Sequence, residues 1–360
     1  MTRTDDIYRS LLRGERLSAD DAALLWREAP LWQLGELACR AKHRVSGDKV
    51  YYNRNFHIEP TNLCAFNCRF CSFRRSEGSP EAWELTPEQI EEQAKARRGS
   101  GATEVHIVGG AHPHKDIHYY ADIIRRVRNV LPAVSVKAFT AVEILYMTRK
   151  SGMTLAEALH LLREAGLDAI PGGGAEIFDS GIRSRICPEK CSAEEWLEVH
   201  AAAHAAGIRT NATMLYGHIE SVEHRIDHLM RLRAQQDATG GFDAFVPLKY
   251  RSAGNALGEV AHEVSVTEDL RTLAMSRLIL DNIPHIKAYW VMYGKQTAEL
   301  ALAFGADDVD GTIDDSTKIY SMAGAEESHP AMSIAEVERM AANAGLRAVE
   351  RDTFYNEIKR

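Results

Sequence analysis

The sequence predicts an α/β fold, a (β/α)8 barrel of the TIM type, from three observations. Five Ser/Thr-x-x-Glu/Gln capping boxes open apolar-periodic segments, which is typical of helix starts. Glycines follow these segments, where a left-handed residue would end a helix. Short apolar runs come after the glycines and are typical of buried strands. Because alternating strands and helices pair in parallel with right-handed crossovers, eight such units favour a closed barrel; an open doubly wound sheet is the alternative.

The elements follow in order along the chain. The capping boxes begin at Thr86, Thr154, Ser192, Ser265 and Ser333, and the glycines are Gly101, Gly166, Gly207, Gly240, Gly305 and Gly345. The strand candidates are 55–61, 104–110, 135–140, 167–174, 208–217, 242–250, 285–291 and 306–313, with a late strand within 346–355. We see no low-complexity linker. We therefore expect a single domain, in which residues 1–50 form a helical extension and 51–360 form the barrel with its C-terminal extension.

Composition limits the classes of function. A chain of 360 residues with 45% hydrophobic content can bury a large core. A formal charge of −8 and a pI near 6.0 argue against a sequence-independent nucleic-acid binder, which needs a basic face. The polar, acidic N-terminus lacks the pattern of a signal peptide, and no apolar run approaches the about 20 residues of a membrane span. We expect a soluble cytoplasmic protein without nucleic-acid or membrane partners.

Three of the six cysteines fall close together after the first predicted strand, as Cys64-x3-Cys68-x2-Cys71. In a barrel the chemistry lies on the loops that follow the strands. The gaps are too short for three side chains to point the same way from a helix or strand, so these thiols converge only in a looped backbone. We expect structural roles for the other cysteines, Cys39, Cys187 and Cys191.

Thiolates select zinc or an iron–sulfur cluster. A structural zinc site takes four ligands and would have to recruit His57 or a distant cysteine. Three cysteines on a [4Fe-4S] cube instead hold three irons and leave the fourth open to a ligand. The spacing alone leaves both possibilities open.

The cysteine motif, with the aromatic Phe70 before its last cysteine and a predicted first barrel strand ahead of it, resembles that of the radical S-adenosylmethionine (SAM) enzymes. In that family the open iron is chelated by the amine and carboxylate of SAM, and an electron from the reduced cluster releases a 5′-deoxyadenosyl radical. The resemblance implies a [4Fe-4S] cluster on Cys64, Cys68 and Cys71, SAM beside Phe70, and an electron donor such as flavodoxin or ferredoxin.

The same resemblance assigns further SAM contacts. Gly109 and Gly110 end the second strand and would meet the SAM amino group, because glycine lets backbone approach a ligand closely. Glu176 would accept hydrogen bonds from the ribose hydroxyls, or is a solvated surface acid. Arg185 would bind the SAM carboxylate in a bidentate pair; Arg183 is an equal candidate, and either arginine also suits a surface salt bridge.

Over residues 50–355 the resemblance is to one family within the radical SAM enzymes. The segments NRNFHIEPTNLCAFNCRFCSF, VHIVGGAHP, VKAFTAVEI, PGGGAEIF, TNATMLYGHIE and FVPLKYRSAGN together are similar to the aminofutalosine (aminodeoxyfutalosine) synthase family of the futalosine route to menaquinone. The implied reaction adds the adenosyl radical to the enol-ether double bond of 3-[(1-carboxyvinyl)oxy]benzoate, with rearrangement and decarboxylation, so that SAM is consumed as a co-substrate. Dehypoxanthine futalosine cyclase and the deazaflavin-forming synthases share the cluster motif and are the alternatives.

A substrate with two carboxylates needs local cations in an acidic protein. Arg251 is our first candidate, with Lys249 two positions before it on the same side of an extended chain. His218 would donate to an anion or shuttle a proton, or it is a satisfied structural histidine. Glu143 would contact the ribose or the substrate, or it caps the next helix. Apolar walls would exclude water from a radical; the candidates are Phe139, Met214, Tyr216 and Tyr289.

Overall fold

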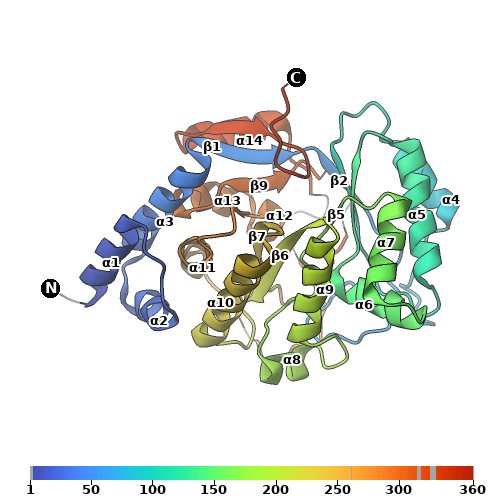
Figure 1. Ribbon diagram of the computed structural model, residues 1–360, viewed down its shortest axis with the longest axis horizontal. Helices are drawn as coiled ribbons and strands as arrows, with labels where there is room; N and C mark the ends of the chain where they lie inside the picture. The colour runs from blue at the N-terminus through green and yellow to red at the C-terminus, as the bar shows by residue number, and fades with distance from the viewer. Residues whose placement is uncertain (1–2, 261, 314–317, 325–329, 360) are drawn as a thin grey trace.

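Seven strands form one curled parallel sheet in the order β2-β3-β4-β5-β6-β7-β8 in the computed structural model, which describes residues 3–260, 262–313, 318–324 and 330–359. The strands are β2 (Asn55–Ile58), β3 (Glu104–Ile107), β4 (Ser135–Ala138), β5 (Ala169–Ile170), β6 (Arg209–Tyr216), β7 (Phe242–Lys249) and β8 (His285–Ile286). Each lies within a predicted strand. Sequence neighbours are therefore spatial neighbours, as parallel βαβ units require (Figure 1).

A second sheet completes the ring. It contains β10 (Arg347–Glu350), β1 (Lys49–Asn53) and β9 (Asp308–Gly311), in the order β10-β1-β9. Strand β9, the eighth predicted strand, pairs with β1 and reaches β8 through a parallel bridge between Lys287 and Asp308. Because β1 runs into β2 with one residue between them, β9 connects the two ends of the larger sheet. This confirms the α/β barrel and places the predicted late strand, β10, beside β1.

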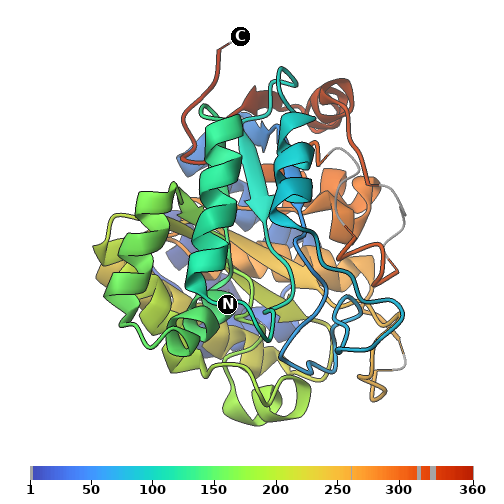
Figure 2. The same cartoon turned by 90° about the vertical axis from the view of Figure 1, so that its right-hand side faces the viewer.

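Helices alternate with the strands, and most of them cover the outside of the sheet. They are α4 (Pro87–Lys95), α5 (Ile117–Val130), α6 (Ala141–Lys150), α7 (Leu155–Ala165), α8 (Ser180–Ile186), α9 (Ala193–Ala205), α10 (Val222–Thr239), α11 (Val266–Ile279), α12 (Trp290–Tyr293), α13 (Lys295–Ala301), the 3-10 helix η1 (Leu302–Phe304) and α14 (Ile334–Asn343). Figure 2 shows α4 and α5 side by side on the outer face. None of the described helices is long and apolar enough to cross a membrane.

The capping chemistry behaves largely as predicted. The boxes at Thr86, Thr154, Ser192 and Ser333 are complete. At Ser265 the hydroxyl accepts from the backbone of Glu268, which is one half of a box. Gly166 and Gly240 end α7 and α10 with φ of 112° and 62°, in the left-handed region that favours glycine.

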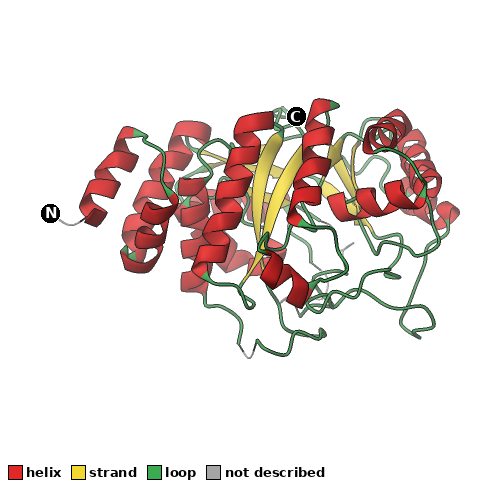
Figure 3. Ribbon diagram, turned by 60° about the horizontal axis from the view of Figure 1, so that its bottom comes forward, coloured by secondary structure: helices red, strands yellow, loops and turns green. Residues whose placement is uncertain are grey.

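Three N-terminal helices precede the barrel, as expected: α1 (Arg3–Arg13), α2 (Ala19–Glu28) and α3 (Leu31–Ser46). Helix α3 packs against α11, and the three helices lie at one side of the barrel in Figure 1. The division of a single domain into a helical extension at 1–50 and a barrel at 51–360 stays a prediction. Figure 3 shows long connecting loops gathered on one side of the sheet.

Candidate functional site

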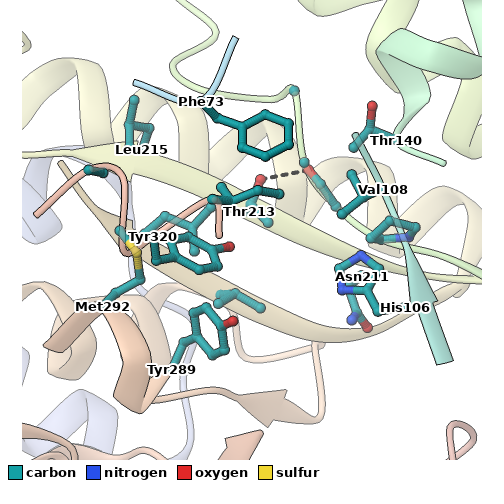
Figure 4. Close-up of a pocket in the computed structure, with 18 of the residues that line it drawn as sticks. Phe73, His106, Val108, Thr140, Asn211, Thr213, Leu215, Tyr289, Met292 and Tyr320 are labelled. Atoms are coloured by element: carbon teal, nitrogen blue, oxygen red, sulfur yellow. Dashed lines mark hydrogen bonds between the residues drawn. The ribbon is translucent and has the colours of Figure 1, made fainter. Parts of the chain in front are cut away.

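A cavity of about 260 Å³ lies inside the ring of strands. Its walls come from β2, β3, β4, β6 and β7 of the larger sheet, from β9, from the loops that follow the strands, and from a segment after β9. The lining residues used below are Phe70, Cys71, Glu104, His106, Lys137, Glu176, Asn211, Lys249, Arg251, Lys287, Tyr289, Asp310, Ile319, Tyr320 and Ala323. Figure 4 shows Tyr289 and Tyr320 on one side of this main cavity and His106 and Asn211 on the opposite side.

Buried ion pairs form part of the wall of the main cavity. Lys137 lies 2.6 Å from Glu104, and Lys287 lies 2.6 Å from Asp310. His106 lies beside them, and burial lowers its pKa to about 3, so the imidazole is neutral near pH 7. Each lysine already has a carboxylate partner. An anionic ligand therefore meets a wall whose charges are balanced, and the binding of its carboxylates depends on donors elsewhere.

A second cavity of about 110 Å³ adjoins the main one and is lined by Cys64, Cys68 and Cys71. The two cavities share Cys71, Phe73, Thr140 and Gly174 as wall residues. The structure thus brings the three predicted cysteines to one space that borders the main cavity. We call this second space the cysteine cavity.

The backbone that carries the cysteines is looped, as their spacing predicted. Cys64 donates its backbone N–H to Arg75 O at 3.1 Å, and Cys71 donates to Cys68 O at 3.2 Å. Ala65 donates to Ala111 O at 2.8 Å, which ties the loop to the chain after β3. These bonds hold the turns that point three closely spaced side chains into one cavity.

The donor set, three cysteine side chains that line one cavity, is typical of an iron–sulfur cluster. In the part of the chain that the structure describes, no group of three or more His, Cys, Asp or Glu side chains converges as one metal ion requires. A cube with cysteines on separate irons needs no such common point. Burial raises the pKa of the Cys64 and Cys68 thiols, so the bare site favours their neutral form and a metal must supply the charge that holds them as thiolates.

Gly109 and Gly110 line the cysteine cavity, and each is also required by close packing. A Cβ on Gly110 would lie 2.1 Å from Leu63 O, and one on Gly109 would lie 2.7 Å from Thr61 O. Gly110 donates its N–H to Thr61 O at 2.8 Å. The glycines therefore let the chain after β3 pack directly against the loop that leads to Cys64.

Glu143 caps α6, as one of the two predictions had it, and also lines the cysteine cavity. One carboxylate oxygen accepts from the backbone and hydroxyl of Thr140 at 2.7 and 2.8 Å and completes a capping box on α6. The other accepts from the Gly109 N–H at 3.4 Å, at the wall of the cysteine cavity. Burial raises the pKa of Glu143 to about 7. The carboxylate is thus a helix cap that also faces the predicted SAM site.

Glu176 is buried at the border of the main cavity and is paired with a residue that sequence reasoning missed. Lys190 Nζ lies 2.7 Å from Glu176 Oε1 and 5.1 Å from the centre of the Phe70 ring. Lys190 lines the cysteine cavity, and its side chain is 14% exposed. The one available signal was its position between Cys187 and Cys191, which the sequence analysis treated as structural.

The structure does not bring Arg185 to either cavity. Its side chain is 51% exposed and lies 3.9 Å from Glu259. Arg183 is buried and donates to the carbonyls of Ala175 and Cys191 at 2.6 and 2.5 Å. Arg183 thus stabilises the loop that carries Glu176 and Lys190.

Arg251 and Lys249 both line the main cavity, as predicted from their alternate spacing. Lys249 is paired with Asp269 at 2.8 Å. Arg251 binds Glu263 through one terminal nitrogen at 2.8 Å and Met292 O through the other at 2.5 Å. Its Nε is buried and has no hydrogen-bond partner among the described residues. Arg251 thus lines the cavity and keeps one buried donor without a partner among the described residues.

His218 is enclosed and lines neither of these cavities. Its Nε2 lies 3.1 Å from Leu215 O, and its Nδ1 accepts from the Ile219 N–H at 2.7 Å. Both ring nitrogens are therefore engaged within the chain. Of the predicted apolar wall residues, Tyr289 lines the main cavity, whereas Phe139, Met214 and Tyr216 are fully buried in the core.

Two family models match the chain in succession. Residues 58–232 match the model described as the Radical SAM superfamily, and residues 239–359 match the one described as the CofH/MqnC C-terminal region. The first begins at the last residue of β2 and includes the cysteine motif and β3 to β6. The second includes β7 to β10 and the segment after β9.

Curated relatives match over nearly the whole length. An aminodeoxyfutalosine synthase of Thermus thermophilus is 42% identical over 98% of this chain and 95% of its own, and one of Streptomyces coelicolor is 40% identical over 98% and 94%. A 5-amino-6-(D-ribitylamino)uracil–L-tyrosine 4-hydroxyphenyl transferase of Methanosarcina barkeri is 38% identical over 99% and 93%. Among solved structures, a methylornithine synthase shares the fold, with a TM-score of 0.75 at 18% identity over 95% of this chain and 96% of that one.

Proposed function

We propose that this chain, which belongs to the radical SAM superfamily and within it to the aminodeoxyfutalosine synthase family, joins the adenosyl group of SAM to 3-[(1-carboxyvinyl)oxy]benzoate and forms aminodeoxyfutalosine. The observation that carries the proposal is the shared wall between the cysteine cavity and the main cavity. A radical made beside the cysteines would reach a substrate in the main cavity without crossing solvent.

Cys64, Cys68 and Cys71 would hold a [4Fe-4S] cluster. When bound, the reduced cluster supplies one electron to SAM, whose cleavage gives methionine and a 5′-deoxyadenosyl radical that adds to the enol-ether double bond. An electron donor such as flavodoxin or ferredoxin and a cytoplasmic location fit this chemistry, because cluster thiolates persist in a reducing compartment. The residues around the cluster would bind SAM and the substrate and orient them.

The SAM site is assigned from what lines the cysteine cavity. Lys190 is a mostly buried cation that lines the cysteine cavity, and we assign to it the SAM carboxylate, in place of the predicted Arg185. Glu176 beside it would accept from the ribose hydroxyls. The backbone at Gly109 and Gly110 would face the SAM amino group, with Glu143 next to it.

Donors of the main cavity would bind the substrate carboxylates. The lysines there are already paired, so an added carboxylate gains most from a donor that is buried and unused. Arg251 Nε is such a donor. We therefore place one carboxylate at Arg251, as the sequence predicted, and the alkene between it and the cysteine cavity.

A second candidate function follows from the relatives named tyrosine 4-hydroxyphenyl transferases, which match this chain at 38% identity or below over most of its length. The matches cover 89% to 99% of this chain and 88% to 96% of the relatives. The two functions use different substrates, so an assay that offers each substrate separately distinguishes them.

The test is an anaerobic incubation of the reduced, cluster-loaded protein with SAM and the enol-ether substrate, followed by mass spectrometry. We expect an adduct that retains the carbon skeleton of the adenosyl group. Formation of 5′-deoxyadenosine without an adduct would contradict the synthase and favour the cyclase. An adduct formed only from L-tyrosine and 5-amino-6-(D-ribitylamino)uracil would favour the transferase.

Cys68→Ala provides the matched negative variant. It should abolish SAM cleavage and leave the circular dichroism spectrum unchanged, because Cys68 lies on a loop and not in a strand. Cys39→Ala, on helix α3, is the control and should keep both cluster content and turnover. Turnover by Cys68→Ala would remove the cluster from the mechanism.

A further inference from the structure

The segment 318–324, in the connection between β9 and α14, forms one wall of the main cavity. Ile319, Tyr320 and Ala323 line the cavity, while Lys318 and Gly324 at the ends of the segment are exposed. The segment therefore lies between the cavity and solvent. The Tyr320 ring meets the Tyr289 ring edge to face at 5.0 Å, and Figure 4 shows both phenols at this side of the cavity.

A buried carboxylate holds this segment. Glu59 follows β2 and is 6% exposed. Its Oε1 accepts the backbone N–H groups of Lys318 at 2.9 Å and Ile319 at 3.3 Å, and its Oε2 accepts from Lys318 at 3.1 Å. Hydrogen bonds from two successive N–H groups to one ionised carboxylate are stronger than neutral ones. They join residues that lie 259 positions or more apart in the sequence.

Segment 318–324 also packs closely against the loop after β7. A Cβ on Gly254 would lie 3.1 Å from Met322 O, and one on Gly324 would lie 2.8 Å from the Ala253 side chain. Ser72, the residue after Cys71, donates its hydroxyl to Ala253 O at 2.5 Å. The cysteine loop, the loop after β7 and the segment 318–324 therefore pack in succession around the cavity.

We propose that Glu59 is a positioning residue that holds segment 318–324 as the outer wall of the reaction cavity, and that this wall keeps external hydrogen donors from the adenosyl radical. The second part rests on the proposed function. A thiol that reaches the radical gives up its S–H hydrogen atom; a C5′–H bond forms, a thiyl radical remains, and 5′-deoxyadenosine is released in place of product. In D₂O the transferred atom is deuterium.

The anchor is tested first without turnover, by hydrogen–deuterium exchange of the cluster-loaded protein. In Glu59→Ala the amides of Lys318 and Ile319 should exchange at least about tenfold faster, because each loses a charge-assisted hydrogen bond. Peptides from β2 and β3 should keep their protection. Glu336→Gln, which alters the cap of α14 at the far end of the same connection, is the matched control and should leave this segment unchanged. Unchanged exchange in Glu59→Ala would overturn the anchor.

The role of the wall is tested by the ratio of adduct to 5′-deoxyadenosine in D₂O with a thiol present. Glu59→Ala and Tyr320→Ala should lower this ratio at least about fivefold and add deuterium to 5′-deoxyadenosine, while Glu59→Gln, which keeps one acceptor oxygen, should fall between them and the wild type. Faster exchange with an unchanged ratio would overturn the wall's role. A wild-type protein that forms no adduct would contradict the proposed function instead, and the exchange result would still decide the anchor.

Discussion

Lys190 Nζ lies 2.7 Å from Glu176 Oε1 at the border between the two cavities. Glu176 is buried, Lys190 is 14% exposed, and the lysine borders the space that the cysteines line. One ammonium group has several donors and can therefore bind the Glu176 carboxylate and the carboxylate of SAM at the same time. This pair is the basis of our assignment of the SAM carboxylate.

Lys190→Ala should therefore weaken SAM binding. We expect the KM for SAM to rise about 10- to 100-fold, the usual cost of one lost charge-assisted hydrogen bond, and Lys190→Arg to restore most of the affinity. Arg185→Ala is the competing variant, since the family resemblance gave Arg185 the same role. A larger rise in KM for Arg185→Ala than for Lys190→Ala would return the assignment to Arg185.

Arg251→Ala should raise the KM for the enol-ether substrate and leave the KM for SAM near its wild-type value. The lost donor is the Nε group without a partner among the described residues, so the expected change is about 10- to 100-fold. Arg251→Lys should rescue little, because lysine lacks the planar fork that also reaches Glu263 and Met292 O. Arg347→Ala, at an exposed site, is the control. Equal effects on both KM values would indicate a structural role.

Glu143→Gln separates helix capping from ligand binding. The amide retains an acceptor for Thr140, so the free energy of unfolding in urea should change by less than about 1 kcal/mol. If the carboxylate also faces SAM, the KM for SAM should rise about tenfold in the same variant. A drop in stability of more than about 2 kcal/mol with an unchanged KM would show that Glu143 only caps α6.

His228 should make stability depend on pH. It is fully buried, stacks on Phe178 with ring centres 3.9 Å apart, and has a pKa lowered by burial to about 3. Because an unfolded histidine titrates near about 6.5, the unfolded state binds an extra proton as the pH falls from there toward 3. The contribution of His228 to the free energy of unfolding is complete above about pH 6.5. Below that pH it falls by up to about 1.4 kcal/mol per pH unit.

Between pH 6.5 and 4.5, the free energy of unfolding of His228→Gln should therefore fall by about 2 to 3 kcal/mol less than that of the wild-type protein. Urea unfolding under anaerobic conditions measures both. His160→Gln, at an exposed position, should follow the wild-type curve. Parallel curves for His228→Gln and the wild type would contradict this origin of acid sensitivity.

Much of the fold was predictable because its signals are local. The complete capping boxes at Thr86 and Thr154 need only residues within one helical turn, and the strand candidates at 208–217 and 242–250, which contain β6 and β7, are short runs between turn residues. The cysteine loop was predictable for the same reason. Its spacing alone requires a turn.

The remainder depends on pairings between distant residues. Sequence reasoning placed Glu176 near the site but missed Lys190, because their contact requires the folded loop after β5. It gave Gly109 and Gly110 to a ligand, whereas packing against Thr61 and Leu63 already requires them. The anchoring of residues 318–319 by Glu59 has no local pattern at either end.

The measurement that tests the central claim most directly is electron–nuclear double resonance on the reduced, cluster-loaded protein, with SAM carrying ¹⁵N at its amino group. The account predicts a cluster signal with a ¹⁵N coupling that appears only with the labelled SAM and is absent from Cys68→Ala. A protein without iron, or a cluster whose fourth iron couples to a protein nitrogen and never to SAM, would contradict it.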